Sequence, residues 1–320
     1  MSRVIAGVVC VGLLTLSLTI ELARAESKTA SEPRGQLVVK RFRDGGYDRR
    51  FRLYSPVNAQ RLRGARPLVL VIHGGASTDR GMLKLDRGRW NTLADHHGFY
   101  VAYPNAVSRL WDFGEGKTSN DLKRRVDDLA YFRHVLTEVS REKPIDPRRI
   151  FATGISRGGQ SSFFLACNLP NRIRAIMPVA MSLPTFMVNE CTSGPPIGIA
   201  IMNGTADPQV PYEGGFIKVF RRTRDEVLST NDTIALWRRR NGCEGISPST
   251  REIDKPGDET SVSITEWSEC DGAPVKLLRI NNGGHTWPSG IQYLPARLVG
   301  ETARDISASE EGWAFFSQFK

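Results

Sequence analysis

Ser156 lies in a glycine-rich segment, Gly154-Ile155-Ser156-Arg157-Gly158-Gly159, of a kind that can make a serine into a nucleophile. The apolar run 149–152 predicts a buried strand before it, and 160–169 predicts a helix after it. A serine on a tight strand-to-helix turn is held in a strained conformation, with its hydroxyl at the sheet edge. The same pattern also occurs where a serine only caps a helix, so the partner residues decide between the two interpretations.

A nucleophilic serine needs a base and an acid that orients this base. Of the five histidines, only His285 follows Ser156 in the chain, in the loop 281–288 after an expected strand. Among the acids between them, Asp207 follows the expected strand 197–202, in a turn with Gly204 and Pro208. In doubly wound hydrolases the order is serine, acid, histidine. The sequence therefore predicts Ser156, Asp207 and His285 as a catalytic triad.

Such a site also needs N–H donors for the negative charge that develops on the ester oxygen. The backbone N–H of Arg157 is one predicted donor because of its position after the serine. The second is predicted at Gly75 or Ala76, in the loop after the unbroken apolar run 67–73. We expect His73 to shape this loop rather than to react.

The remaining elements predict an α/β-hydrolase fold, in which a mostly parallel, doubly wound sheet positions these loops. An N-terminal antiparallel hairpin is expected from two alternating stretches, 36–43 and 49–54. An irregular insert or cap is expected at 183–196. Further strands are expected at 98–104, 175–180, 262–267 and 275–280, and helices at 90–97, 126–142, 230–241 and 307–319.

The N-terminus predicts export. Residues 4–20 are almost wholly apolar, Arg3 precedes them, and Ala23-Arg24-Ala25 is typical of a signal-peptidase site. A membrane anchor is the alternative, but the apolar run is short for a spanning helix. We expect a cleaved signal peptide at 1–25, a flexible tail at 26–35 and one catalytic domain at 36–320. The protein is then secreted or periplasmic, with no stable membrane association after cleavage.

Four cysteines remain after this cleavage: Cys167, Cys191, Cys243 and Cys270. They can pair in three ways, of which pairing between sequence neighbours closes two short loops. Four reduced, buried thiols are the alternative, but disulfides suit an exported protein better. No metal-ligand spacing is present, and the predicted chemistry needs neither metal nor cofactor.

The formal charge of +10 would attract anionic partners such as acidic polysaccharides, anionic lipid or nucleic acid. The arginines are dispersed along the chain, however, and no nucleic-acid-binding motif is present. We therefore interpret them as a solvated surface and predict no nucleic-acid partner. Trp287 and Trp111 are candidates for contact with the substrate, and core packing is an equal alternative for Trp111.

Several segments together resemble the secreted polyhydroxybutyrate depolymerase and feruloyl esterase-like branch of the α/β-hydrolases. The resemblance begins near Leu68, reaches the C-terminus, and implies Ser156 as nucleophile, Asp207 as acid, His285 as base and a Cys243–Cys270 disulfide. It rests on His73-Gly74-Gly75, Gly98-Phe99, Tyr103-Pro104-Asn105, Val126-Asp127-Asp128, Gly154-Ile155-Ser156-Arg157-Gly158-Gly159, Gly204-Thr205-Ala206-Asp207, Val210-Pro211-Tyr212-Glu213-Gly214-Gly215, Asn241-Gly242-Cys243 and Gly284-His285-Thr286-Trp287-Pro288.

Two positions depart from this family pattern. Asn203 stands where the family often has histidine, and Arg157 stands where a small or neutral residue is usual. A cation in the first helical turn opposes the helix dipole. We expect Arg157 either to contact an acidic group of the substrate or of a neighbouring loop, or to extend into water.

The prediction for the whole chain is a secreted serine esterase that hydrolyses carboxylic esters through an acyl-enzyme. Esters of small, oligomeric or polymeric hydroxyalkanoates, as in polyhydroxybutyrate depolymerases, are the first substrate class. Feruloyl or acetyl esters of plant cell walls are the alternative. A catalytically inactive binding protein with a hydrolase fold is the alternative of another class.

Overall fold

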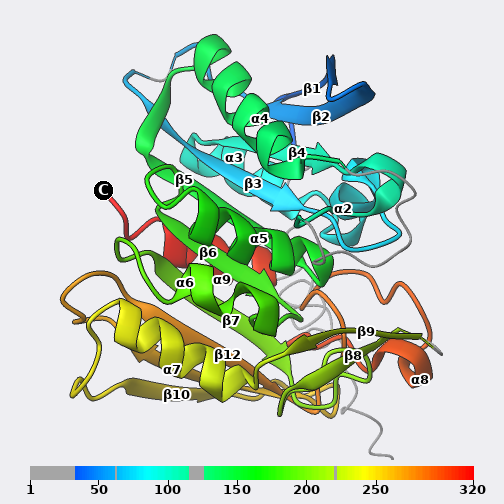
Figure 1. Cartoon of the computed structure of the whole chain (residues 1–320), viewed down its shortest axis with the longest axis vertical. Helices are drawn as coiled ribbons and strands as arrows, with labels where there is room; N and C mark the ends of the chain where they lie inside the picture. Colours follow the sequence, from blue (N-terminus) through cyan, green and yellow to red (C-terminus); the bar gives the residue numbers. More distant parts are fainter. Residues whose placement is uncertain (1–32, 62, 115–125, 220–221) are drawn as a thin grey trace, which may run out of the picture. The chain divides into compact units, whose positions relative to one another are not determined.

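A ten-stranded β-sheet runs through the computed structural model, which describes residues 33–61, 63–114, 126–219 and 222–320 (Figure 1). The expected signal peptide, 1–25, lies outside the described residues, as does the expected tail up to residue 32. Within the described residues, no helix combines the length and the apolar character of a transmembrane span.

The centre of the sheet is parallel and its two edges are antiparallel, which agrees with the mostly parallel sheet predicted from the sequence. The central strands, in spatial order, are β4 (Tyr100–Asn105), β3 (Arg66–Ile72), β5 (Ile145–Ile155), β6 (Ala175–Val179), β7 (Gly198–Gly204) and β12 (Val275–Asn281). One edge continues from β4 to β2 (Tyr47–Ser55) and β1 (Gln36–Asp44), and the other from β12 to β11 (Ser261–Trp267) and β10 (Ser249–Ile253).

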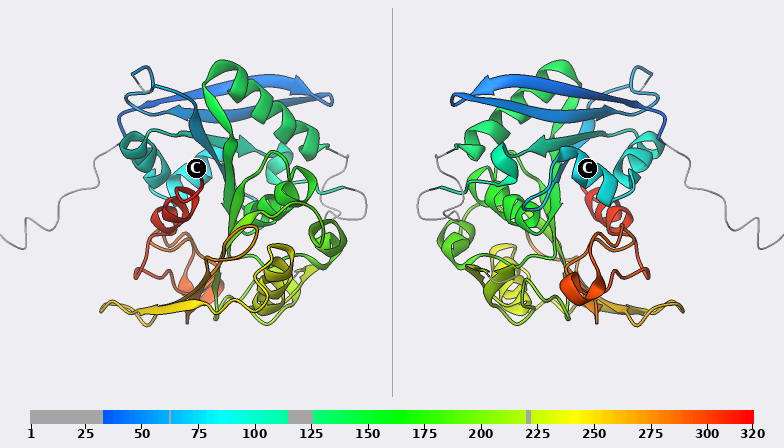
Figure 2. Two further views of the ribbon diagram at one scale, coloured as in Figure 1. Left: turned by 90° about the vertical axis from the view of Figure 1, so that its left-hand side faces the viewer. Right: turned by 90° about the vertical axis from the view of Figure 1, so that its right-hand side faces the viewer.

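Helices cover both faces of the sheet (Figure 2). One face packs against α4 (Asp128–Glu142), α5 (Arg157–Asn168), α6 (Val188–Cys191) and α7 (Thr230–Arg240). The other packs against α2 (Asp79–Leu85), α3 (Arg89–His97) and α9 (Ala308–Phe316). The short helices η1 (Val107–Arg109), η2 (Thr185–Met187) and α8 (Ala296–Val299) lie in loops.

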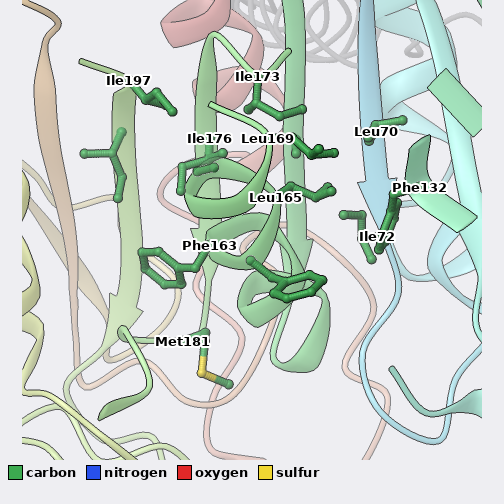
Figure 3. Packing of buried hydrophobic residues seen from close by; sticks show 14 of the residues in the cluster. Leu70, Ile72, Phe132, Phe163, Leu165, Leu169, Ile173, Ile176, Met181 and Ile197 are labelled. Carbon is green, nitrogen blue, oxygen red and sulfur yellow. The ribbon is translucent and has the colours of Figure 1, made fainter. Parts of the chain in front are cut away.

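The apolar run of β3 shows why both faces are covered. Leu68, Leu70 and Ile72 belong to one hydrophobic core, and Val69 and Val71 belong to the core on the opposite face. Successive side chains of a strand point to opposite faces, so a strand without polar positions needs a cover on each side. Figure 3 shows the layer that holds the labelled residues of β3, α4 and α5.

The N-terminal hairpin forms as predicted, with β1 and β2 antiparallel over their whole lengths, from Gln36 opposite Ser55 to Asp44 opposite Tyr47. Its two-residue turn consists of Gly45 and Gly46, both with positive φ (55° and 83°). This geometry matches the twist of the paired strands, and glycine adopts it without steric cost.

Several structured segments were not predicted. These are a separate two-stranded sheet of β8 (Gly215–Val219) and β9 (Arg222–Val227), the edge strand β10, the helix α2 and the short helices η1 and α8. The strands β9 and β10 are rich in charged residues, and such strands carry only a weak alternation signal. The insert expected at 183–196 contains only the short helices η2 and α6.

Two disulfides link sequence neighbours, Cys167 to Cys191 and Cys243 to Cys270. The first joins the C-terminal end of α5 to α6, so it fastens the helix that begins at the candidate nucleophile. The second joins the loop after α7 to the loop before β12. Cys191 and Cys243 are both fully buried in the same hydrophobic core.

Candidate active site

Ser156 occupies a strained turn between β5 and α5, as the sequence predicted. Its φ is 56° and its ψ is −122°, which L-residues rarely adopt. Its backbone N–H donates to the carbonyl of Val179, the last residue of β6. A Cβ atom on Gly154 or Gly158 would overlap the carbonyl oxygen of Ile72, so these positions must be glycine for α5 to pass β3. The strained turn places the Ser156 side chain at the wall of a cavity.

His285 and Asp207 meet at the same edge of the sheet. Asp207 follows β7 and His285 follows β12, and these neighbouring strands run in parallel with Gly204 opposite Ile280. The Nδ1 atom of His285 lies 2.7 Å from Oδ2 of Asp207, and both side chains are almost fully buried. Because a carboxylate only accepts hydrogen bonds, Nδ1 carries the proton and Nε2 is left as the basic atom.

The other oxygen of Asp207 is held by the backbone. Oδ1 accepts hydrogen bonds from the N–H groups of Gln209 and Val210, at 2.7 Å and 2.9 Å. The hydroxyl of Tyr293 donates to the His285 carbonyl at 2.8 Å. Burial, together with the nearby Asp207 charge, raises the pKa of Tyr293, so this phenol stays protonated as a donor. The orientation of the pair is thus fixed from both sides.

Ser156 and His285 line one cavity of about 540 Å³. Its wall is mostly aliphatic, and its polar members include Ser77, Gln160, Gln209 and Arg224. The aliphatic wall consists of Met82, Leu85, Leu110, Ile155, Met181, Ile217, Val219, Ile291 and Leu294. Such a cavity binds an apolar group and leaves the reacting atoms at its polar side.

The loop after β3 supplies one clear oxyanion candidate. The Ala76 N–H donates to the carbonyl of Arg109 at 3.0 Å, so the expected role of Ala76 as a donor does not fit this geometry. The Gly75 N–H makes no hydrogen bond within the described part of the chain, and Gly75 lines the cavity. Arg157 begins α5, where backbone N–H groups have no acceptor within the helix. Gly75 and Arg157 are therefore the two positions that suit an oxyanion.

His73 holds this loop in place. Its Nδ1–H donates to the Gly74 carbonyl at 2.7 Å, and its Nε2 accepts from the Ala106 N–H at 3.1 Å. Burial lowers the pKa of His73 to about 4, so the ring is neutral near pH 7. This structural role agrees with the expectation for His73.

Neither tryptophan can contact a substrate, which corrects the expectation for Trp287 and decides for core packing, one of the two alternatives, at Trp111. Trp111 is fully buried, and its Nε1–H donates to the His73 carbonyl at 2.9 Å. Trp287 is 1% exposed and packs in the core beneath α9, with its Nε1–H directed at Ser309 Oγ, 3.3 Å away. A large apolar ring gains more free energy in the core than at a wet cavity wall, even two residues from His285.

Arg157 contacts an acid of a neighbouring element, which is one of the two expected alternatives. Its Nη1 lies 3.8 Å from Oδ2 of Asp225 on β9, and its guanidinium lies over the ring of Phe113, 5.4 Å from the centroid. The same Asp225 oxygen accepts from Gln160 Nε2 at 3.4 Å. Two residues of the nucleophile helix thus bind the β8–β9 hairpin.

Asn203 has a purely structural set of contacts. Its Oδ1 accepts from the Met181 N–H at 2.9 Å, and its Nδ2 donates to Ser182 Oγ and Thr230 Oγ1, both at 3.0 Å. It links the end of β6 to the start of α7, and it does not line the cavity. A neutral amide therefore satisfies this buried position fully.

The sequence did not predict the cavity wall that the β8–β9 hairpin provides. Ile217, Val219 and Arg224 of this hairpin line the cavity opposite the loop after β3. The adjacent Gly214 and Gly215, both with positive φ, lie where the chain passes from the ten-stranded sheet into the separate β8–β9 sheet. The alternation Phe216-Ile217-Lys218-Val219 that follows this glycine pair is the signal that indicates the first strand.

Known proteins similar in sequence are esterases, and no family model matches the chain. "Putative esterase NocK" of Nocardia uniformis subsp. tsuyamanensis is 29% identical over 83% of this chain and 78% of its own length. Feruloyl esterase B of Piromyces equi is 30% identical over 58% of this chain, but the match spans only 32% of that protein. Feruloyl esterase D of Neurospora crassa is 25% identical over 86% of this chain and 83% of its own length.

Among solved structures, the acetyl xylan esterase from Aspergillus awamori has a similar fold. The TM-score is 0.52 at 17% identity, over 80% of this chain and 96% of that one. The predicted α/β-hydrolase fold is confirmed. The sequence relatives bear out the predicted enzyme class, a carboxylic ester hydrolase.

Proposed function

We propose that this chain hydrolyses carboxylic esters with Ser156 as nucleophile, His285 as general base and Asp207 as the acid that orients the base. The observation that carries the proposal is the buried His285–Asp207 contact of 2.7 Å beside a cavity that Ser156 also lines. The strained φ of Ser156 supports it, because such strain is found where a reactive side chain must be presented.

The proposed reaction has two halves. His285 Nε2 takes the proton of the Ser156 hydroxyl while Oγ attacks the ester carbonyl carbon, and the N–H groups of Gly75 and Arg157 stabilise the oxyanion. The ester bond breaks, His285 returns the proton to the leaving alcohol, and an acyl-enzyme remains. Water, deprotonated by His285, then releases the acid and restores Ser156. The Asp207 carboxylate stabilises the imidazolium in both halves.

We propose feruloyl-type esters, in which the acid is aromatic, as the substrate class. A mostly aliphatic cavity of about 540 Å³ suits an aromatic acid better than an acetyl group, which would leave most of it unfilled. The names of the relatives from Piromyces equi and Neurospora crassa support the same class. Hydroxybutyrate oligomers, the first substrate class expected from the sequence, are the competing substrate in the test.

The test compares methyl ferulate, acetylated xylan, hydroxybutyrate oligomers and p-nitrophenyl acetate, with Ser156→Ala as the control protein. We expect turnover of methyl ferulate with the highest kcat/KM among the natural esters, and loss of all turnover in Ser156→Ala. Preference for hydroxybutyrate oligomers would replace the proposed substrate class. If even p-nitrophenyl acetate is not hydrolysed, the inactive binding protein is the correct interpretation.

We also propose that the protein acts outside the cytoplasm. Two disulfides support this location, because disulfides persist in oxidising compartments. Expression of the full chain in a Gram-negative host, followed by fractionation and N-terminal sequencing, tests it. We expect a periplasmic or secreted product that begins at Glu26. A product retained in the cytoplasm with its first residues intact would contradict the proposal.

A further inference from the structure

A second hollow, of about 660 Å³, borders the active-site cavity on the side of the β1–β2 hairpin. Thr78 and Arg109 line this hollow, whereas their chain neighbours Ser77 and Leu110 line the active-site cavity. The hydrogen bond from the Ala76 N–H to the Arg109 carbonyl joins the two segments that separate the hollows. The second hollow can therefore receive the part of a substrate that extends beyond the ester.

Arginine side chains dominate this hollow. The lining residues Arg49 and Arg50 are neutralised, by Asp128 at 2.5 Å and Asp79 at 3.1 Å. Two further lining residues, Arg41 and Arg109, are exposed, and neither forms an ion pair or hydrogen bond with its guanidinium within the described part of the chain. We call the hollow with these four arginines the arginine groove.

One feature of the arginine groove costs stability in the absence of a ligand. Ser108 and Arg109 both have positive φ, 50° and 62°, which costs free energy for residues other than glycine. Arg41 lies directly opposite Arg50 in the β1–β2 pairing, and Asp79 offsets the charge of Arg50 only. A strained turn beside arginines without an ion pair in the described residues is typical of a place that holds a ligand.

The neutral groups of the groove limit the kind of anion. Ser108 contributes a hydroxyl, and Thr78 a hydroxyl whose oxygen also accepts from the Gly81 N–H. The amide of Asn105 accepts from the Asp79 N–H and donates to the Ala106 carbonyl, so it shapes the groove. These groups suit a chain of hydroxylated rings. The exposed Asp48 also lines the groove and opposes an anion, so any anion must sit closer to the arginines.

We propose that the arginine groove binds the carboxylate of an acidic sugar on the alcohol side of the ester substrate. A guanidinium matches a carboxylate with two parallel hydrogen bonds, which gives geometric selectivity as well as attraction. This inference rests on the proposed function, since it deepens the substrate class to an aromatic ester carried by a uronic-acid-containing glycan.

The test measures binding to the inactive Ser156→Ala protein by calorimetry, with galacturonic acid oligomers and neutral xylose oligomers as probes. We expect the acidic oligomers to bind more tightly and to lose affinity as salt rises. Arg41→Gln and Arg109→Gln should each weaken this binding about three- to tenfold. Asp48→Asn should strengthen it, because it removes the opposing charge. Arg148→Gln, with the same charge change at the distant start of β5, should leave it unchanged.

Three results would overturn the inference: equal binding of acidic and neutral oligomers, no effect of the Arg41 and Arg109 substitutions, or an equal effect of Arg148→Gln. Inorganic phosphate serves as a competitor, and tight phosphate binding without binding of the galacturonate oligomers would identify a phosphate site instead. Binding needs no turnover, so a failure here is distinct from a failure of ester hydrolysis by the unsubstituted enzyme.

Discussion

The two carboxylate oxygens of Asp207 have separate tasks. One accepts two backbone N–H groups, and the other lies 2.7 Å from His285 Nδ1. In Asp207→Asn, the retained oxygen can still accept the backbone N–H groups, and the NH₂ group then faces His285. The His285 ring must then accept at Nδ1 and carry its proton on Nε2, so Nε2 can no longer take the proton of the Ser156 hydroxyl.

We therefore expect Asp207→Asn to lower kcat for p-nitrophenyl acetate about 10³- to 10⁴-fold, with little change in the melting temperature. Steady-state kinetics and circular dichroism measure the two quantities. A loss of activity below tenfold would show that Asp207 does not orient the base.

We expect the buried His73 to make the free energy of unfolding depend on pH. Its pKa is lowered from 6.5 in the unfolded chain to about 4 in the native protein, because it is buried. Between these values the unfolded chain binds more protons, so the free energy of unfolding falls as the pH drops from 6.5 to 4. The expected loss from this residue is on the order of 3 kcal/mol.

Denaturant unfolding at several pH values measures this loss. His73→Gln should be less stable at pH 7 but should lose less stability on acidification to pH 4. His96→Gln, at an exposed position on α3, serves as the control and should keep the steep dependence. Identical slopes for all three proteins would contradict the role given to His73.

Among the elements, the β8–β9 hairpin decides the shape of the cavity. It supplies Ile217 and Val219 to the wall, and Asp225 is its polar contact with Arg157 and Gln160 on α5. The hairpin also pairs with the main fold through the bridge between Pro184 and Val227. Loss of the Asp225 contact should loosen the wall without unfolding the sheet.

We expect Asp225→Ala to raise KM for methyl ferulate severalfold and to change KM for p-nitrophenyl acetate less, because a small acyl group touches less of the wall. Glu226→Ala, at the exposed neighbouring position on β9, is the matched control and should leave both values near those of the unsubstituted enzyme. Equal increases for both esters in Asp225→Ala would show that the residue does not set acyl selectivity.

At the scale of the whole molecule, the two disulfides close loops of similar size, with sequence separations of 24 and 27 residues. Each crosslink restricts the unfolded chain, which stabilises the native state by about 3 kcal/mol for loops of this length. Both attach helices that pack on one part of the sheet: α5 contacts β6, and α7 contacts β7 and β12, the strands that the Asp207 and His285 loops follow.

We expect the Cys167→Ser/Cys191→Ser and Cys243→Ser/Cys270→Ser proteins each to lose about 3 kcal/mol in the free energy of unfolding. Urea unfolding under non-reducing conditions measures it. The protein that lacks both should lose nearly the sum, because the crosslinks constrain separate loops. An unchanged unfolding midpoint in either variant would contradict the stabilising role of that disulfide.

The sequence by itself determined the order and type of the main elements, because apolar runs and glycine-rich turns encode local structure. It also singled out Ser156, Asp207 and His285, since in a parallel sheet the loops that follow neighbouring strands meet at one edge. Only the tertiary structure decided the surroundings of these residues. It buried Trp111 and Trp287 and bound the Ala76 N–H to the Arg109 carbonyl. It also placed Asp225 beside Arg157, and Arg109 beside the β1–β2 hairpin. These contacts join residues far apart in the chain. Whether a side chain points into the core or into the cavity depends on the free energy of packing against such distant residues, and a local sequence pattern does not contain this information.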